Sequence, residues 1–132
     1  MEAKKIIITG GATRIGAAIA RSLAEDATDI TIHYNSSASK AKKIKKELDE
    51  FGINVHLLKC NLKKEKEVAQ LIRKAKKQMG GLDCLINNAS IFENDDISNF
   101  NSKSWEKHII VNLKSPSTVS YTHLTLPTIC SV

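Results

Sequence analysis

The sequence predicts an α/β fold in which a doubly wound parallel sheet of about four strands carries helices on both faces. Two observations indicate this class. Short runs of β-branched residues alternate along the chain with segments whose apolar residues recur at helical spacing. Hydrophobic residues make up 42% of the 132 residues and charged residues 26%, which is typical of a globular domain with one core and excludes a disordered or fibrous chain.

The first strand and helix are predicted near the N-terminus. Lys5–Thr9 is a short β-branched run, typical of a strand that is buried on both faces of a parallel sheet. Gly10-Gly11 closes this run and allows a tight turn. Apolar residues then recur four apart, which predicts a helix from Arg14 to about Asp26 that packs back on the strand.

Strand and helix then alternate through the rest of the chain. β-Branched or apolar runs predict strands at 29–34, 53–59 and 83–86, and a polar loop is expected at 91–102. Three more helices are marked by apolar stripes, which are Ala41-Ile44-Leu48-Phe51, Val68-Leu71-Ile72-Ala75-Met79 and Trp105-Ile109-Leu113.

The composition changes near the C-terminus. All Lys, Arg, Asp and Glu residues fall within positions 1–114, and the remaining segment is crowded with Ser, Thr and isolated apolar residues. We therefore expect a single domain over residues 1–116, followed by a non-native or disordered tail at 117–132 that carries no chemistry.

Charge and cysteine content restrict the classes of partner. The net charge of +6 raises the possibility of nucleic acid, but the excess lysines are interleaved with glutamates on predicted helices and lack aromatic neighbours, as on a solvated helix face. Three cysteines without paired or metal-ligand spacing predict reduced thiols and no metal. With no apolar run long enough for a membrane span or a signal peptide, we expect a cytoplasmic protein without a membrane partner.

The candidate site lies at the carboxyl ends of the predicted strands, where doubly wound sheets bind ligands. Gly10-Gly11, 34–36, 61–62 and 87–90 all follow strands. The turn at 9–16 offers backbone N–H groups and a helix N-terminus, which suit a pyrophosphate. Glycine spacing alone is also compatible with a plain strand-to-helix turn.

Several spaced motifs resemble those of the short-chain dehydrogenase/reductase family. They are Thr9-Gly10 to Ile15-Gly16, Asn61-Leu62, Asn87-Asn88-Ala89 and Asn112, and the resemblance covers positions 4 to about 116. Arg14 replaces the family's middle glycine, as in members that resemble pteridine reductases, and Asn88 to Phe92 also matches that branch. The resemblance implies a Rossmann-type domain, here incomplete.

The resemblance also assigns roles to individual residues. Asn112 is the expected catalytic asparagine, which orders a proton-relay water, and Ser90 and Phe92 are expected to face the substrate. For Phe92, a loop hydrophobe that caps the sheet is an equal alternative. The expected cofactor-binding residues are Gly10, Arg14, Ile15, Gly16, Tyr34, Asn35, Ser36, Ser37, Asn61, Leu62, Asn88, Ala89 and Ser90.

Charge at the end of the second predicted strand favours NADP(H) as the cofactor. An NAD site usually places a carboxylate there, but residues 34–37 contain none. Arg14 offers a guanidinium fork for a 2′-phosphate, with the hydroxyls of Ser36 and Ser37 nearby. Asn61 stands where the family usually has an adenine-contacting aspartate.

The chain lacks the family's Tyr-x-x-x-Lys proton donor, since Tyr121 is followed four residues later by Thr125. Family members are also roughly twice as long, and residues 117–132 resemble translated adapter DNA. We therefore expect the front part of an NADP(H)-dependent reductase that is inactive alone. The intact parent would be a homo-oligomer that reduces a pterin-like or other small carbonyl or imine substrate. The alternatives are a noncatalytic nucleotide-binding module and a basic RNA-binding α/β domain.

Overall fold

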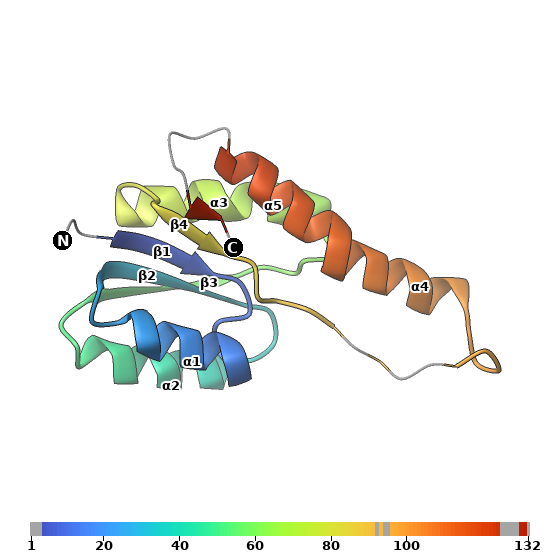
Figure 1. Cartoon of the computed structure of the whole chain (residues 1–132), viewed down its shortest axis with the longest axis horizontal. Coiled ribbons are helices and arrows are strands. Elements are labelled where there is room, and N and C mark those ends of the chain that lie inside the picture. Colours follow the sequence, from blue (N-terminus) through green and yellow to red (C-terminus); the bar gives the residue numbers. More distant parts are fainter. Residues whose placement is uncertain (1–3, 92, 94–95, 125–129, 132) are drawn as a thin grey trace.

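The computed structural model describes residues 4–91, 93, 96–124 and 130–131, which form a parallel sheet with helices on both faces (Figure 1). The strand order is β3-β2-β1-β4-β5, and all four pairings are parallel. The strands are β1 (Lys4–Ile8), β2 (Ala27–Tyr34), β3 (Asn54–Lys59), β4 (Cys84–Ile86) and β5 (Cys130–Ser131). The helices are α1 (Arg14–Leu23), α2 (Ala38–Asp49), α3 (Glu65–Met79), α4 (Ser102–Ile109), the π-helix η1 (Ile110–Lys114) and α5 (Ser115–Leu124).

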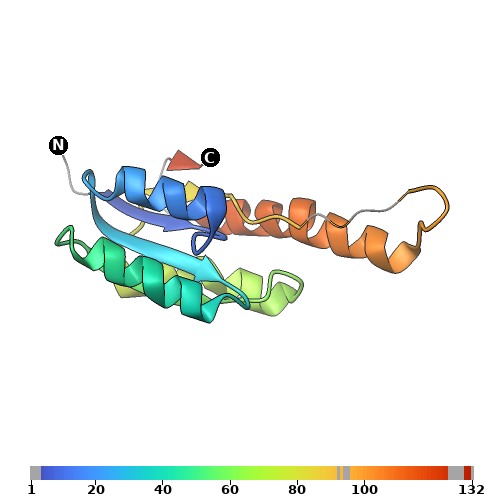
Figure 2. The ribbon, with the colours of Figure 1, turned by 90° about the horizontal axis from the view of Figure 1, so that it is seen from below.

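Two layers of helices bury the two faces of the sheet. Helices α1 and α2 cover one face, and α3 and α5 cover the other, whereas α4 runs beyond the sheet (Figures 1 and 2). The central strand β1 serves both cores, since Ile6 and Ile8 pack with residues of α1 and α2 while Ile7 packs with residues of α3 and α5. This alternation explains why every position of the run is apolar.

The structure confirms the predicted fold class and the four predicted strands, with small differences at their ends. Helix α1 ends at Leu23, because the N–H groups of Ala24 and Asp26 donate to carbonyls only three residues back, to Arg21 and Leu23. Strand β2 consequently starts at Ala27, two residues earlier than predicted. Within the described residues, no helix is both long and apolar enough to cross a bilayer.

The segment after Pro116 is helical as far as Leu124 and Cys130–Ser131 pairs with β4, so the structure has regular elements where a non-native or disordered tail was expected. Three of its hydroxyls bond within the helix, since the side chains of Ser117, Thr118 and Thr122 donate to carbonyls four residues back. Val119 is 1% exposed and packs in the core cluster with α3. Tertiary packing therefore overrides the weak helix propensity of this Ser/Thr-rich stretch. That residues 117–132 are not native to the protein remains a prediction.

Candidate functional site

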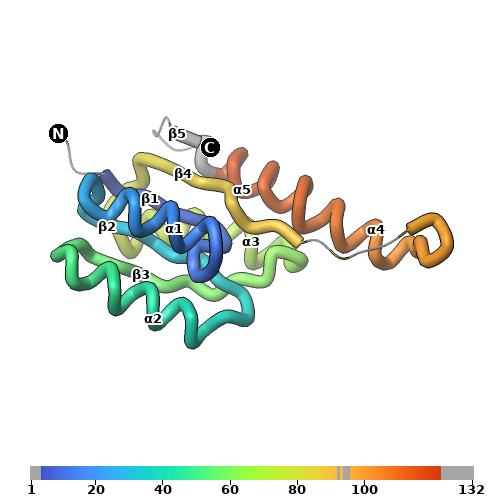
Figure 3. Tube along the Cα trace, turned by 60° about the horizontal axis from the view of Figure 1, so that its bottom comes forward, coloured from blue at the N-terminus to red at the C-terminus, as the bar shows by residue number. Residues whose placement is uncertain are grey.

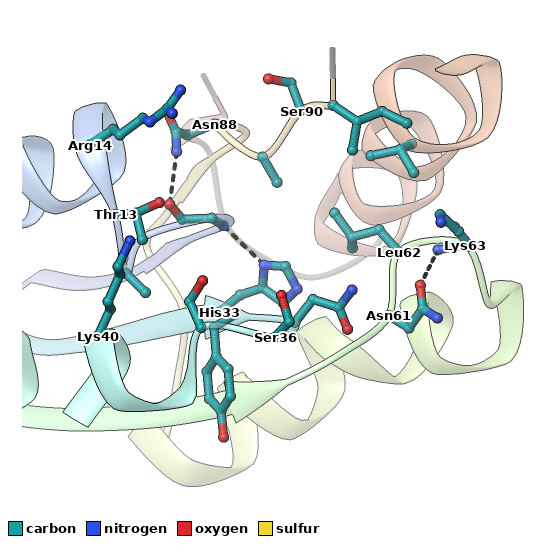
Figure 4. A pocket seen from close by; sticks show the side chains of 18 of the residues that line it. Thr13, Arg14, His33, Ser36, Lys40, Asn61, Leu62, Lys63, Asn88 and Ser90 are labelled. Carbon is teal, nitrogen blue, oxygen red and sulfur yellow. Dashed lines mark hydrogen bonds between the residues drawn. The ribbon is translucent and has the colours of Figure 1, made fainter. Parts of the chain in front are cut away.

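A cavity of about 700 Å³ opens at the carboxyl ends of β1 to β4 (Figure 4). It is lined by residues that follow each of these strands, so the sheet topology brings four distant segments together (Figure 3). Of the residues expected from the sequence, twelve line it, namely Gly10, Arg14, Ile15, Tyr34, Asn35, Ser36, Ser37, Asn61, Leu62, Asn88, Ala89 and Ser90. Gly16 and Asn112 do not line it, and Phe92 lies outside the described residues.

The glycine turn after β1 is held by the end of β2. The Gly10 N–H donates to His33 Nδ1 at 3.0 Å, and the Gly11 N–H donates to the His33 carbonyl at 3.1 Å. These two N–H groups are therefore not free for a ligand, contrary to expectation. The first N–H groups of α1 have no partner within the helix, and the N-cap Thr13 makes no side-chain capping bond to them. An anion would bind at this helix end rather than at the glycines.

Gly16 lies behind the cavity wall and permits a close approach between α1 and the turn. A Cβ at this position would stand 2.2 Å from the Gly10 carbonyl oxygen and 2.6 Å from Asn88 Nδ2. Asn88 Nδ2 itself donates to the carbonyls of Thr9 and Gly10, both at 3.1 Å. Gly16 therefore acts through packing, without direct access to a ligand.

Thr9 ties the end of β1 to the end of β4. Its Oγ1 accepts the N–H groups of Asn88 at 3.0 Å and Ala89 at 3.1 Å, and the residue is 3% exposed. The N–H groups of Asn88 and Ala89, two of the expected cofactor-binding residues, are thus used to fix the backbone. Both residues also line the cavity.

The cavity is strongly basic. Arg14, Lys40, Lys63 and Lys107 line it, and among the described lining residues Glu93 is the single acid. Glu93 forms an ion pair with Lys107, which lowers the pKa of the Glu93 carboxyl. In Figure 4, Arg14 and Lys40 lie on one side of the cavity and Lys63 on the other. The arrangement suits a ligand with several negative charges.

Arg14, one of the cations that line the cavity, also has an unusual backbone conformation. Its φ is +49°, in the left-handed region where glycine is favoured. Arg14 therefore keeps the conformation of a glycine position while presenting a charged, exposed side chain to the cavity. The conformation costs free energy that the fold must offset elsewhere.

The turn after β3 supplies the opposite wall. Asn61 Oδ1 accepts the Lys63 N–H at 3.0 Å, and the Asn61 N–H donates to Glu67 Oε2 at 2.9 Å. The latter bond is the main cause of a lowered Glu67 pKa. Burial raises the pKa of the Cys60 thiol to about 11, so this cysteine remains protonated at neutral pH. Asn61 retains its side-chain NH₂ group as a donor for a ligand.

Both ends of the Asn112 carboxamide bond to the cavity wall. Its Oδ1 accepts the Ile91 N–H and its Nδ2 donates to the Ile91 carbonyl, both at 2.8 Å. One turn earlier, His108 Nε2 accepts the Glu93 N–H at 3.1 Å. The side chain of Asn112 therefore holds the segment after β4, and one N–H of Nδ2 and one lone pair of Oδ1 remain beyond these two bonds.

Sequence reasoning missed His33, Lys40, Lys63, Glu93 and Lys107. The lysines are a few among many in the sequence, and nothing local distinguishes those that line the cavity. His33 sits in a β-branched run and resembles a core residue, because its partners are distant in sequence.

Comparisons with known proteins agree with this geometry. A family model described as short chain dehydrogenase matches residues 4–129. The 3-oxoacyl-[acyl-carrier-protein] reductase FabG of Staphylococcus epidermidis is 31% identical over 111 residues, which are 84% of this chain and 46% of that protein. The chain thus spans about half the length of the curated relatives it matches.

Two solved structures are similar over most of the chain. A short chain dehydrogenase from Burkholderia cenocepacia J2315 in complex with NADP has a TM-score of 0.89 at 28% identity, covering 92% of this chain and 50% of that one. FolM alternative dihydrofolate reductase 1 from Brucella canis, complexed with NADP, has a TM-score of 0.83 at 29% identity, covering 95% and 53%.

Proposed function

Because the chain belongs to the short-chain dehydrogenase family, we propose that residues 1–116 form a domain that binds NADP(H) in the basic cavity. The positive charge of the cavity is the main observation that supports this proposal. Four cationic side chains and one paired carboxylate line the cavity, and no acid follows β2. A 2′-phosphate adds about −1.5 to −2 charge, which such a cavity favours over the bare ribose of NAD(H).

The donor set fits this group. The N-terminus of α1 would bind the pyrophosphate, and Arg14 and Lys40 would bind the 2′-phosphate with the hydroxyls of Ser36 and Ser37. Asn61 and Leu62 would contact the adenine, while Asn88, Ala89 and Ser90 would line the nicotinamide side. The two similar structures in complex with NADP support this choice of cofactor.

The whole protein is proposed to be a reductase, in which the bound nicotinamide supplies hydride to a carbonyl or imine. Ser90 and Phe92 would face the substrate. Asn112 would hold the wall at Ile91 and order a relay water. A pterin-like substrate is favoured by Arg14 and by the likeness to FolM, whose name includes dihydrofolate reduction. The FabG relatives are named for 3-oxoacyl groups on acyl-carrier protein, which favours a 3-oxoacyl substrate as the alternative. The intact parent is proposed to be a homo-oligomer.

A second candidate is a noncatalytic nucleotide-binding module. It is favoured by the absence of Tyr-x-x-x-Lys from this sequence, since hydride transfer needs a proton donor beside the acceptor. We expect no turnover by this chain with NADPH and pterins, quinones or aldehydes. Turnover that disappears in Asn112→Ala would show that the missing donor is supplied in another way.

Cofactor titration tests the proposed binding. Arg14→Ala and Lys40→Ala should each weaken NADPH more than NADH, Arg14→Ala by about 1.5–3 kcal/mol, because a charge-assisted bond to the 2′-phosphate is lost. Lys42→Ala is the matched control, since Lys42 lies exposed on α2 and does not line the cavity. Equal losses of affinity for the two cofactors would show that the tested side chain does not contact the 2′-phosphate.

A further inference from the structure

His33 occupies the junction of three strand ends directly beneath the cavity. It is 2% exposed and lies at the end of β2, next to Tyr34. Its Nδ1 accepts the Gly10 N–H at 3.0 Å, and its Nε2 lies 2.9 Å from the Cys60 carbonyl oxygen beyond β3. One imidazole ring thus joins the glycine turn to the turn that precedes Asn61. Figure 4 shows the bond to the glycine turn.

These two partners determine the protonation state of the ring. A backbone N–H can only donate and a carbonyl can only accept, so Nδ1 must be unprotonated and Nε2 must carry the hydrogen. The imidazolium form would place a hydrogen on Nδ1, against the Gly10 N–H. Protonation therefore keeps the bond to Cys60 and breaks the bond to Gly10.

The surroundings favour the neutral ring. Burial is the main influence on the His33 pKa and lowers it below its usual value of 6.5, while the bond to the Cys60 carbonyl opposes this change. The neighbouring titratable groups are the Tyr34 phenol, the protonated Cys60 thiol, Glu67 of α3, and the cations that line the cavity, which are Arg14, Lys40, Lys63 and Lys107. Glu67 is occupied by the Asn61 N–H and by Lys64.

We propose that His33 is a positioning residue for dinucleotide binding, which holds the glycine turn against α1 only while it is neutral. The inference rests on the proposed function, because it concerns affinity at the same cavity. Dinucleotide affinity should be full above about pH 6.5 and should fall as the pH drops through the lowered pKa of His33. The fall in affinity at low pH must appear with NADH as well as with NADPH. NADPH alone has a 2′-phosphate that titrates near this range, so a fall with NADPH only would come from the phosphate.

Two substitutions separate the two bonds. His33→Asn keeps an acceptor near the position of Nδ1 and loses the donor to Cys60, whereas His33→Gln keeps a donor near Nε2 and loses the acceptor for Gly10. Each leaves one buried backbone group unpaired, so their costs in stability should be similar. We expect His33→Gln to weaken NADPH and NADH by about tenfold at pH 8 and His33→Asn by less than about threefold. Equal losses of affinity would assign His33 a merely structural role.

The pH profile of binding completes the test. Both variants should lose the acidic fall in affinity, while His56→Gln, at a histidine that pairs with Asp29 far from the turn, should keep it. Ring ¹⁵N shifts of the unsubstituted chain should show an unprotonated Nδ1 and a protonated Nε2, a measurement that needs no variant to fold. The opposite tautomer, or pH-independent binding, would overturn the role of His33 alone. No binding of either cofactor at pH 8 would overturn the proposed function as well.

Discussion

The region from β1 to α2 buries most of its large apolar side chains, whereas the region from α4 to α5 leaves most of its described ones exposed. In the first, Ile8, Ile30 and Leu48 are fully buried between the sheet and its helices. In the second, α4 has no buried residue, and Leu113 and Tyr121 are 59% and 72% exposed. The apolar stripe Ala41-Ile44-Leu48 of α2 is buried, whereas the stripe Trp105-Ile109-Leu113 of α4 and η1 is exposed. In α1 the apolar residues spaced four apart are buried only in part, since Ile15 is 70% exposed.

Position relative to the sheet explains the difference. Helices α1 and α2 lie flat on a sheet face, whereas α4 extends beyond the carboxyl ends of the strands (Figure 1). Periodicity thus reports that a helix is amphipathic, and the topology decides whether its apolar side finds a partner. The free energy of unfolding should accordingly depend on the first region far more than on the second.

The largest expected effect is at the helix–turn contact of the first region. Gly16→Ala would place a Cβ 2.2 Å from a backbone oxygen, so α1 must move, and we expect a loss of about 3 kcal/mol or more in urea unfolding. Gly52→Ala is the control. Its Cβ meets nothing within 4 Å, so only the positive φ of +78° should cost free energy, about 1 kcal/mol. Similar losses would mean that the close approach at Gly16 is not required.

Matched aliphatic truncations compare the two regions directly. Ile30→Ala removes a fully buried side chain and should lower the free energy of unfolding by about 2–5 kcal/mol. Leu113→Ala, at 59% exposure, should change it by less than about 1 kcal/mol. A large loss at Leu113 would show that the α4–η1 stripe is covered in solution.

Val119 tests whether the second region contributes any core, and with it the status of 117–132. Val119→Ala should cost about 1.5 kcal/mol, because two buried carbon groups are lost from the contact with α3. Tyr121→Ala on the same helix should be nearly neutral, since Tyr121 is 72% exposed. No loss at Val119, together with an unchanged melting temperature after truncation at Pro116, would support a foreign segment.

The smallest effect has the opposite sign. Arg14→Gly should stabilise the fold by about 0.5–1 kcal/mol, because glycine adopts the φ of +49° without strain, while NADPH affinity falls. Ala18→Gly, at an exposed position inside α1, should instead destabilise by about 1 kcal/mol in the same urea titration. A destabilised Arg14→Gly would mean that the side chain supports the fold itself.

The sequence was sufficient to predict those features that depend on local pattern. Lys5–Thr9 predicted a strand buried on both faces, and the position of each segment after a strand predicted the cavity that Arg14, Asn61 and Asn88 line. Strand ends meet in a parallel sheet whatever the side chains are, so this part of the site follows from topology.

The rest depended on contacts between distant residues. His33 bonds to groups 23 and 27 residues away, and Lys40 differs from the neighbouring lysines only in facing the cavity. Residues 117–124 are poor helix formers individually, and their helix is stabilised where Val119 packs with α3. No periodicity in the sequence encodes these pairings.

The pairing of Asn112 and His108 with Ile91 and Glu93 has a mechanical consequence. Asn112 of η1 bonds both backbone groups of Ile91, and His108 of α4 accepts the N–H of Glu93. Two attachment points on successive turns resist both sliding and rotation of this wall segment along the helix. We therefore expect a displacement of α4 and η1 to move the cavity wall with it.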